Sequence, residues 1–198
     1  MMWAGRILGS LLAILAILIV VILIAGANAK ANLKARYPAP GQLVDMGGYR
    51  MHISCQGEGS PTVILEAGGG DSSLIWALVQ PQVAKITRVC AYDRAGFGWS
   101  DLSPKPRTAQ NIVEELHILL VKSGITGPYI LVGHSMGGMI IRLYAHQYPD
   151  EVAGMVLVDS VHEEQSLRFP DTVQKALAQL ENKTQQQLGL FKILSTGN

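Results

Sequence analysis

The chain begins with a long, continuous apolar stretch. No charged residue lies between Arg6 and Lys30, and residues 7–29 are dense in Leu, Ile, Val and Ala. At about 1.5 Å of rise per residue, roughly 20 helical residues cross the hydrocarbon layer of a bilayer. The pattern therefore predicts a transmembrane or signal-anchor helix over residues 7–29, followed by a short, proline-containing linker over residues 30–42.

A cleaved signal peptide is the alternative interpretation of this segment. Ala27-Asn28-Ala29 has the small-x-small pattern of a cleavage site, and cleavage after Ala29 would release a secreted protein. The apolar run is longer than the ~7–15 residues typical of a signal peptide, which favours an uncleaved, single-pass anchor in a membrane. Positive residues flank the run on both sides, Arg6 before it and Lys30, Lys34 and Arg36 after it, so the orientation is left open.

Beyond the linker, strand-like and helix-like segments alternate. The apolar strands are hydrophobic on both faces, which is typical of a parallel sheet covered by helices on both sides. The predicted fold class is therefore α/β, with its core over residues 43–160. The predicted elements are a hairpin over 43–45 and 50–55, strands over 62–66, 88–92, 129–132 and 155–158, a helix over 74–85 that Pro81 kinks or ends, a helix capped by Thr108 that ends near Gly124, and a helix that stops at Pro149.

Composition narrows the functional classes. The net charge is +1, which argues against the broad basic face that a nucleic-acid-binding protein needs. The two cysteines are too few for a disulfide scaffold or a Cys-rich zinc site. We therefore expect no nucleic-acid partner, no metal site and no cofactor.

One short sequence carries the chemistry. Gly133-His134-Ser135-Met136-Gly137 is a G-x-S-x-G pattern with a predicted strand before it and a predicted helix after it, the context of a nucleophile elbow. Such a turn strains the backbone of the serine and exposes its Oγ. Strand and helix pass so closely that side chains at 133 and 137 would collide. The helix N-terminus also favours a developing oxyanion next to Ser135.

Two further loops follow strands of the same predicted sheet. Ala67-Gly68-Gly69-Gly70 comes after one apolar strand and could aim a backbone N–H at the same oxyanion. The segment Asp93–Ser100 has the pattern D-R-x-G-x-G-x-S and follows the next strand. Ligands of open parallel sheets gather at this carboxyl edge.

With these motifs in this order, the chain resembles the α/β-hydrolase family from about Val44 to Asp159. The resemblance implies that Ser135 is the nucleophile of a serine hydrolase, which disfavours the members that use an aspartate nucleophile, such as haloalkane dehalogenases and epoxide hydrolases. It implies an oxyanion hole formed by the backbone N–H groups of Gly69 and Met136. The family's usual His-Gly before the oxyanion residue is Ala67-Gly68 here, which keeps the backbone donor.

The acid and the histidine of the triad are harder to place. In this fold both follow the nucleophile, and the family places the histidine after later strands. The chain printed here is expected to stop inside a cap that begins over residues 161–198, with an amphipathic stripe at Val173, Leu177 and Leu180. Asp159 is a candidate acid and His162 a candidate base, whereas His146 lies on the helix that runs away from the elbow.

The resemblance implies a membrane-anchored serine hydrolase that acts on a small-molecule ester, thioester or amide through an acyl-enzyme. An inactive fragment or pseudoenzyme without a base is the alternative, and an acyltransferase or cofactor-free haloperoxidase shares the same elbow. The family arrangement also places the strand of Cys55 antiparallel to the strand of Cys90. The two thiols are then either a disulfide, which would indicate an oxidising compartment, or two buried hydrophobic side chains.

Overall fold

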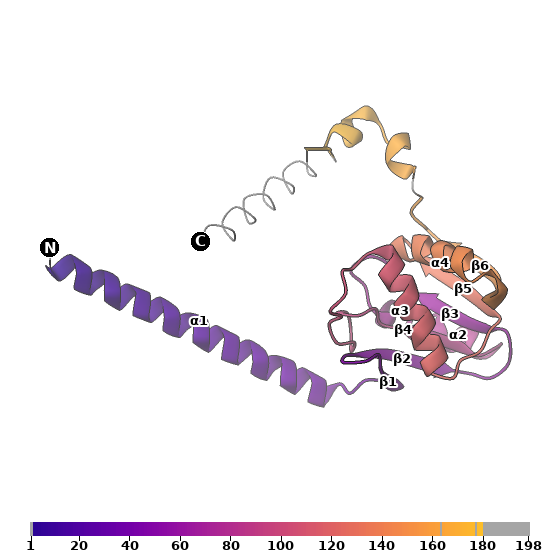
Figure 1. The fold of residues 1–198 in the computed structure, drawn as a ribbon, viewed down its shortest axis with the longest axis horizontal. Helices are drawn as coiled ribbons and strands as arrows, with labels where there is room; N and C mark the ends of the chain where they lie inside the picture. The colour runs from indigo at the N-terminus through magenta and orange to yellow at the C-terminus, as the bar shows by residue number, and fades with distance from the viewer. Residues whose placement is uncertain (1, 163, 177, 180–198) are drawn as a thin grey trace.

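A computed structural model of the chain describes residues 2–162, 164–176 and 178–179. Its first element is the long helix α1, Met2–Arg36, which projects away from a folded α/β domain (Figure 1). Within α1, the segment Leu11–Leu33 has a mean hydropathy of 3.0, and none of its most apolar stretch is buried against the rest of the protein. Among the described helices it is the one long and apolar enough to cross a membrane. The helix continues beyond residue 29 through most of the predicted linker.

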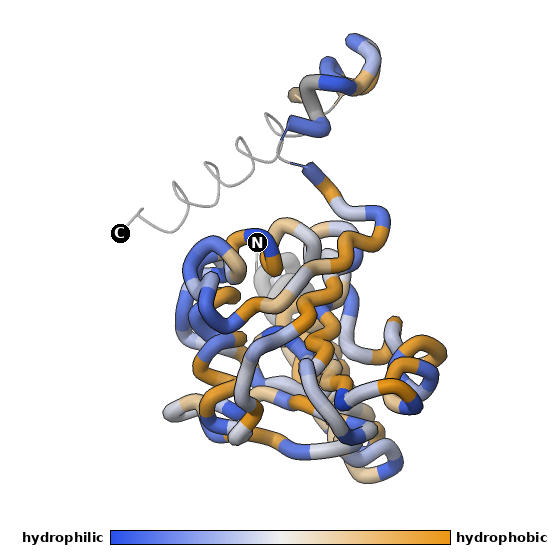
Figure 2. Tube along the Cα trace, turned by 90° about the vertical axis from the view of Figure 1, so that its right-hand side faces the viewer, coloured by the Kyte–Doolittle hydropathy of each residue, from blue (hydrophilic) through white to orange (hydrophobic). Residues whose placement is uncertain are grey.

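A six-stranded sheet forms the centre of the domain, in the order β1-β2-β4-β3-β5-β6. The first two strands form the predicted hairpin, β2 pairs antiparallel with β4, and the pairs β3–β4, β3–β5 and β5–β6 are parallel. Hydrophobic segments of the chain run through the middle of the domain and alternate with polar turns (Figure 2). The strands are β1 (Gln42–Asp45), β2 (Arg50–Gln56), β3 (Thr62–Glu66), β4 (Val89–Tyr92), β5 (Tyr129–His134) and β6 (Val152–Val158).

Helices cover both faces of this sheet, as the strand pattern predicts. On one face, α3 (Ala109–Lys122) and α4 (Met136–Gln147) bury the larger hydrophobic core. On the other face, the turn η1 (Ser73–Trp76) and the short helix α2 (Gln80–Val83) cover a smaller cluster around Trp76. Two short 3₁₀ helices follow, η2 (Pro149–Glu151) and η3 (Gln165–Arg168), and residues 171–176, which include Val173, are helical.

Most predicted elements are confirmed, and one helix differs. The Thr108 hydroxyl accepts a hydrogen bond from the Asn111 N–H at 3.2 Å, which makes it the cap of α3. The predicted helix over 74–85 is instead two short pieces, and Pro81 lies in the first turn of the second piece. Proline fits there because its missing N–H would have no partner in a first turn. Of the predicted cap stripe, Leu177 and Leu180 lie outside the described residues.

The strand at the end of the described sheet has exposed apolar side chains on both of its faces. Exposed fractions run from 39 to 50% over Met155–Val158, whereas every second residue of the neighbouring strand β5 is buried and the others are half-buried. Apolar side chains on both faces of a strand are typical of a position inside a covered sheet. This edge therefore corresponds to the apolar strand that the sequence predicts at 155–158.

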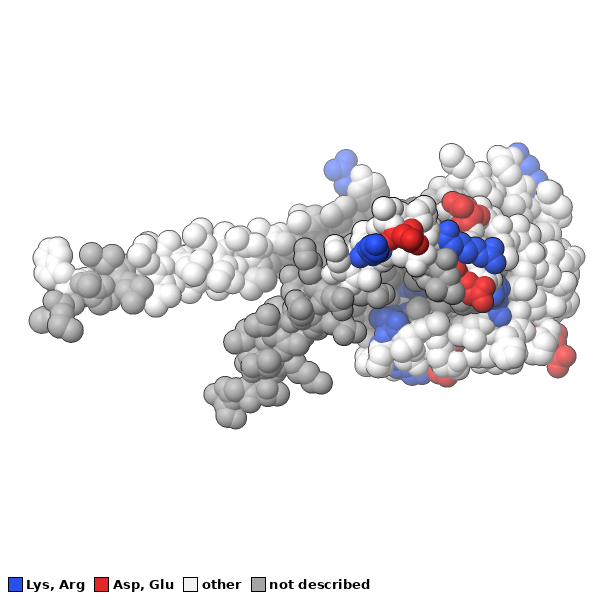
Figure 3. Space-filling view, turned by 90° about the horizontal axis from the view of Figure 1, so that it is seen from above, with Lys and Arg blue, Asp and Glu red and all other residues white. Residues whose placement is uncertain are grey.

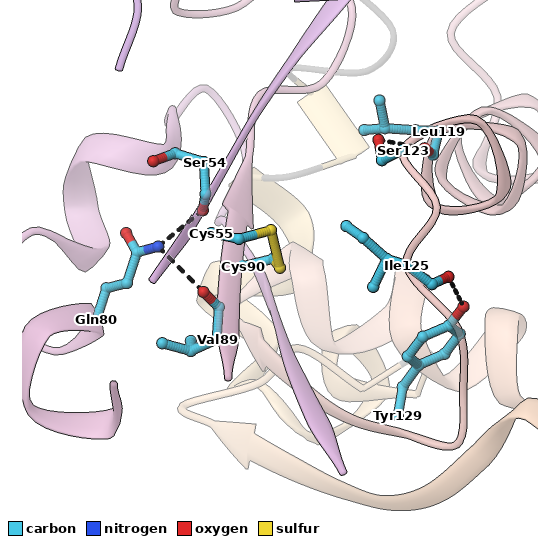
Figure 4. Close-up of a disulfide and its surroundings, with 9 residues drawn as sticks. All are labelled: Ser54, Cys55, Gln80, Val89, Cys90, Leu119, Ser123, Ile125 and Tyr129. Carbon is cyan, nitrogen blue, oxygen red and sulfur yellow. Dashed lines mark hydrogen bonds between the residues drawn. A yellow bond between two sulfur atoms is a disulfide. The ribbon is translucent and has the colours of Figure 1, made fainter. Parts of the chain in front are cut away.

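Cys55 and Cys90 form a disulfide between β2 and β4 (Figure 4). The two residues are direct partners in the antiparallel register. The Gln80 side chain of α2 lies beside this bridge and donates hydrogen bonds to the carbonyl oxygens of Ser54 and Val89 at 2.8 and 3.4 Å. The bridge thus joins the hairpin to the parallel part of the sheet.

We expect both cysteines to resist alkylation in protein isolated without reductant, because each sulfur is committed to the bridge and Cys90 is fully buried. After reduction in denaturant, both should react. Mass spectrometry of alkylated peptides makes the measurement. Two alkylated thiols in native, unreduced protein would contradict the bridge.

The surface carries no single-sign field on the face seen in Figure 3. Lys and Arg side chains lie beside Asp and Glu side chains over the domain. This mixture agrees with the net charge of +1.

Candidate active site

Ser135 occupies the junction between β5 and α4. Its φ of 51° and ψ of −121° lie in a region that residues with a side chain rarely adopt. The Ser135 N–H donates to the Val158 carbonyl at 3.1 Å, and its own carbonyl accepts from Gly138 and Val161. The strand–turn–helix geometry predicted for the G-x-S-x-G sequence is therefore present.

The glycines of this turn are required by close packing. A Cβ on Gly133 would lie 2.7 Å from the carbonyl carbon and oxygen of Gly137. A Cβ on Gly137 would lie 2.5 Å from the Ala67 carbonyl oxygen and 2.7 Å from that of Glu66. These contacts are with buried backbone of α4 and of the end of β3, which cannot shift cheaply. The predicted collision at 133 and 137 is thus present, and the turn is wedged against the end of β3.

The candidate oxyanion loop begins at the end of β3, directly beside the elbow. Glu66 and Gly133 are register partners, so the residues that follow them start from the same edge of the sheet. A Cβ on Gly69 would lie 3.6 Å from the Sδ of Met136, which places Gly69 against the residue after Ser135. Within the described part of the chain, neither the Gly69 N–H nor the Met136 N–H donates to another element. Both predicted donors are therefore brought to the elbow.

A buried ionic cluster of Arg94, Glu66 and Tyr92 binds the backbone of this loop, and sequence reasoning missed it. The Arg94 guanidinium lies 3.0 Å from the Glu66 carboxylate and donates to the carbonyl oxygens of Ala67, at 3.1 Å, and Gly68. The Tyr92 hydroxyl donates to the other oxygen of Glu66. Arg94, Glu66 and Tyr92 are all nearly inaccessible to solvent. Arg94 therefore fixes the backbone on which the predicted oxyanion donor Gly69 depends.

The rest of the D-R-x-G-x-G-x-S loop is also explained by packing. The Asp93 carboxylate accepts from the backbone N–H of Ser73 at 2.6 Å and of Trp99 at 3.0 Å. A Cβ on Gly98 would lie 2.2 Å from that carboxylate. The Ser100 hydroxyl donates to the Asp93 carbonyl at 2.7 Å. The motif ties the loops after β3 and β4 into one rim around the elbow.

His52 completes this rim and is not available as a catalytic base. Its Nδ1 lies 2.9 Å from the Asp93 carboxylate, and both side chains are inaccessible to solvent. Its Nε2 contacts the Pro40 carbonyl, so both ring nitrogens are engaged. Burial acts to raise the pKa of Asp93, but hydrogen bonds from His52, Ser73 and Trp99 outweigh it and hold that pKa below its ordinary value.

The predicted acid and base lie on the turn after β6. Asp159 has a positive φ of 42° at the end of that strand. The Val161 N–H donates to the Ser135 carbonyl at 3.2 Å, which brings the backbone next to His162 against the elbow. The His162 Nδ1 accepts the Glu164 N–H at 3.1 Å, and its ring is exposed. Their catalytic roles stay predictions.

The other two histidines of α4 and β5 do not change this assignment. His134 lies under the oxyanion loop, since a Cβ on Gly68 would meet its Nδ1 at 2.8 Å. His146 is exposed in the last turn of α4, far along the helix from Ser135. In the described residues, no three His, Cys, Asp or Glu side chains are grouped to hold a metal ion.

Burial raises the pKa of Glu66 to about 7, against the opposing charge of Arg94 and the hydrogen bond from Tyr92. Between the ordinary pKa of 4.5 and about 7, the folded protein holds a proton that the unfolded chain has released. Stability should therefore fall as pH rises through this window, by up to about 3 kcal/mol, and level off above it. We expect Glu66→Gln to remove this slope.

The measurement is urea unfolding of the full chain in detergent micelles at pH 5, 6, 7 and 8, followed by intrinsic fluorescence. The free-energy difference between wild type and Glu66→Gln should change with pH over this range. A free-energy difference between the two proteins that stays constant from pH 5 to pH 8 would contradict a raised pKa of Glu66.

Comparison with known proteins agrees with this geometry. A sequence model of the family described as alpha/beta hydrolase fold matches residues 61–195. A probable transporter of Hormonema carpetanum is 37% identical over 136 residues, which are 65% of this chain and 20% of that protein. An uncharacterized vacuolar membrane protein of Saccharomyces cerevisiae is 34% identical over 138 residues, 61% of this chain and 21% of that protein.

Among solved structures, an epoxide hydrolase is similar with a TM-score of 0.56 and 27% identity, over 61% of this chain and 42% of that one. The chain thus spans about a fifth of the length of the two relatives and less than half of this structure. The family match covers more than half of the chain, and it includes the elbow, both rim loops and most of the sheet. The chain belongs to the α/β-hydrolase family.

Proposed function

We propose that this protein is a membrane-anchored serine hydrolase that cleaves an ester, thioester or amide through an acyl-enzyme. The observation that supports it best is the backbone of Ser135, whose φ of 51° places a strained serine at a strand-to-helix turn with the Gly69 loop against its neighbour Met136. Strain of this kind is concentrated at functional sites, because an ordinary turn would not retain it.

In the proposed reaction, the Ser135 Oγ bonds to the acyl carbon and gives its proton to a base. The carbonyl oxygen becomes an oxyanion that accepts hydrogen bonds from the Gly69 and Met136 N–H groups. The leaving group departs with a proton, and the acyl-enzyme remains. Water then adds to the same carbon, Ser135 regains its proton, and a carboxylic acid is released.

His162 and Asp159 are the base and acid that we propose to test first. Both lie on the turn whose Val161 N–H contacts the Ser135 carbonyl. The wild-type rate should fall in His162→Gln if this histidine takes the serine proton, since a general base contributes roughly 10²–10⁴-fold. An unchanged rate would leave the base to a residue outside the described part of the chain.

The anchor is the apolar part of α1, Leu11–Leu33, and the proposal is supported by its length and hydropathy and by the vacuolar membrane relative. The Cys55–Cys90 bridge supports a location of the domain in an oxidising compartment. The domain would then lie on the side of the membrane away from the cytosol.

Covalent labelling tests the nucleophile directly. A fluorophosphonate probe should label the full chain on Ser135, and Ser135→Ala should lose the label. Ser160→Ala is the matched control, because the Ser160 Oγ lies only 3.4 Å from the Ser135 carbonyl and is the serine hydroxyl next to the elbow. Labelling that survives Ser135→Ala would overturn the assignment, and an unlabelled wild type would favour a pseudoenzyme.

A further inference from the structure

The rim of the candidate site lies unusually close to the apolar end of α1. The Trp99 indole N–H donates to the Tyr37 carbonyl at 3.0 Å, and the Tyr37 N–H donates to the Leu33 carbonyl at 2.9 Å. Leu33 is the last residue of the apolar span. Four helical residues rise about 6 Å, and the headgroup layer is about 5–7 Å thick on each side of a bilayer. Trp99 is therefore held at headgroup depth.

A cavity of about 700 Å³ lies between the helix and this rim. Helix α1 supplies Gly26, Ala29, Leu33 and Tyr37 as one wall, and the domain supplies Leu74, Gly98 and Trp99 as the other. Gly26 and Ala29 belong to the apolar span itself. The domain wall therefore faces the apolar span across this open cavity, with Trp99 at the headgroup end, and the cavity has the size of a small-molecule site.

The segment that follows the candidate oxyanion loop carries exposed apolar side chains beside this cavity. Leu74 is 59% exposed and Leu78 is 86% exposed, and Ile75 and Val79 are also exposed. We call these four residues the Leu74–Val79 patch. Contiguous apolar residues on a surface mark contacts with proteins or membranes. Since Leu74 also lines the cavity, the patch continues the wall that faces α1.

The bilayer is the partner that fits this arrangement. The patch and the cavity share Leu74, and the cavity shares Gly26 and Ala29 with the span, so the apolar surface is continuous from the proposed anchor to the domain. Trp99 and Tyr37 lie where this surface meets polar backbone, which is the usual place of Trp and Tyr at a membrane interface. Figure 1 shows α1 as a straight projection from the domain, and the apolar span ends at Leu33, four residues before Tyr37 at this junction.

We propose that the carboxyl edge of the sheet rests on the bilayer through the Leu74–Val79 patch, and that the substrate is an acyl ester whose long chain remains in the lipid. This inference rests on the proposed serine hydrolase. Gly69, the predicted oxyanion donor, precedes Leu74 by five residues on the same loop, so a chain in the cavity lies within one loop of the elbow. The ester group reaches Ser135 from the membrane side without passing through bulk water.

Photo-cross-linking tests the docking independently of catalysis. The full chain carrying benzoylphenylalanine at Leu78, in phosphatidylcholine vesicles, should form phospholipid adducts on irradiation. The matched control is benzoylphenylalanine at Val121, an apolar side chain with 61% exposure at the last turn of α3. Helix α3 leads from the loop after β4 to the start of β5, so Val121 lies at the opposite edge of the sheet. Adducts at 78 but not at 121 support the docking, and no adduct at 78, or equal adducts at both positions, overturns it.

Turnover tests the substrate class. Leu78→Asp should lower hydrolysis of a long-chain acyl ester embedded in the same vesicles by about tenfold, because a charge replaces a side chain that contacts lipid. Hydrolysis of p-nitrophenyl acetate in solution should stay unchanged, since Leu78 is neither in the elbow nor in the oxyanion loop and does not line the cavity. Equal losses on both esters would overturn the lipid substrate. If wild type hydrolyses neither ester, the proposed serine hydrolase is wrong, and so is the substrate class that rests on it. The cross-linking result still decides whether the patch contacts the bilayer.

Discussion

Replacement of Ser135 by glycine is expected to abolish turnover and at the same time to stabilise the fold relative to alanine at this position. The Ser135 φ of 51° and ψ of −121° cost any residue with a Cβ of the order of 1–3 kcal/mol. Glycine adopts this conformation without that cost, although it loses about 0.4–1 kcal/mol more through the unfolded chain. The strain outweighs the entropy, so Ser135→Gly should exceed Ser135→Ala in stability by about 1 kcal/mol.

Turnover, unlike stability, should not distinguish the two variants. Both variants lack the Oγ that we assign as nucleophile, and removal of a nucleophile costs several orders of magnitude in turnover. Urea unfolding in micelles and ester hydrolysis on the same preparations make the comparison, with Ser123→Gly and Ser123→Ala as a control pair. Ser123 has an ordinary φ of −82° at the end of α3, so there glycine should be no more stable than alanine. Equal stability of the two Ser135 variants would show that the elbow is unstrained.

The elements of this domain are readable from the sequence because its strands are short apolar runs bounded by turns. The prediction over 62–66 coincides with β3, and the predicted helix cap at Thr108 is made by the side chain that was expected. Proline was misread at one position. The pattern over 74–85 predicts one helix that Pro81 kinks or ends. Proline is also common in the first turn of a helix, and Pro81 lies in the first turn of α2.

The elbow was also readable, because G-x-S-x-G restricts the backbone as well as the chemistry. A Cβ at either of its two glycines would lie 2.5–2.7 Å from neighbouring backbone, so both positions require glycine and can be recognised in the sequence. The acid and the base that would assist the nucleophile have no comparable sequence pattern. Asp159 and His162 are single residues in an irregular turn, and nothing in their spacing distinguishes a catalytic pair from a polar loop.

The cluster beneath the oxyanion loop was missed for a different reason. Glu66 ends an apolar strand and Arg94 follows the next strand, so each alone resembles the first polar residue of a loop. The signal that could have found the pair is the order of the strands. Because β3 and β4 are parallel neighbours, the residues at their carboxyl ends lie at one edge of the sheet. Glu66 at the end of β3 and Arg94 after β4 are therefore expected to form an ion pair.

Loss of Arg94 is expected to be among the most damaging single changes in the domain. Arg94→Met keeps most of the side-chain volume but leaves the fully buried Glu66 without its cation and frees the carbonyl oxygens of Ala67 and Gly68. At pH 8, above the Glu66 pKa of about 7, breaking this buried pair on one side should cost about 3–5 kcal/mol, a large part of a domain stability of ~5–15 kcal/mol. Arg50→Met is the control, since the Arg50–Asp101 pair is half exposed and should contribute less than about 1 kcal/mol.

A double-mutant cycle separates the lost pair from the lost loop contacts. In a Glu66→Gln background, Arg94→Met no longer strands a buried acid, so it should cost at least about 1 kcal/mol less than in wild type. The same relief should appear in wild type at pH 5, below the raised pKa of about 7 at which Glu66 takes up its proton. The part of the loss that remains in both cases belongs to the carbonyl oxygens of Ala67 and Gly68, and this part should accompany slower acylation at Ser135, because the Gly69 donor is no longer held in place. If Arg94→Met costs the same in both backgrounds and at both pH values, Arg94 acts only through the loop, and the ion pair with Glu66 contributes nothing to stability.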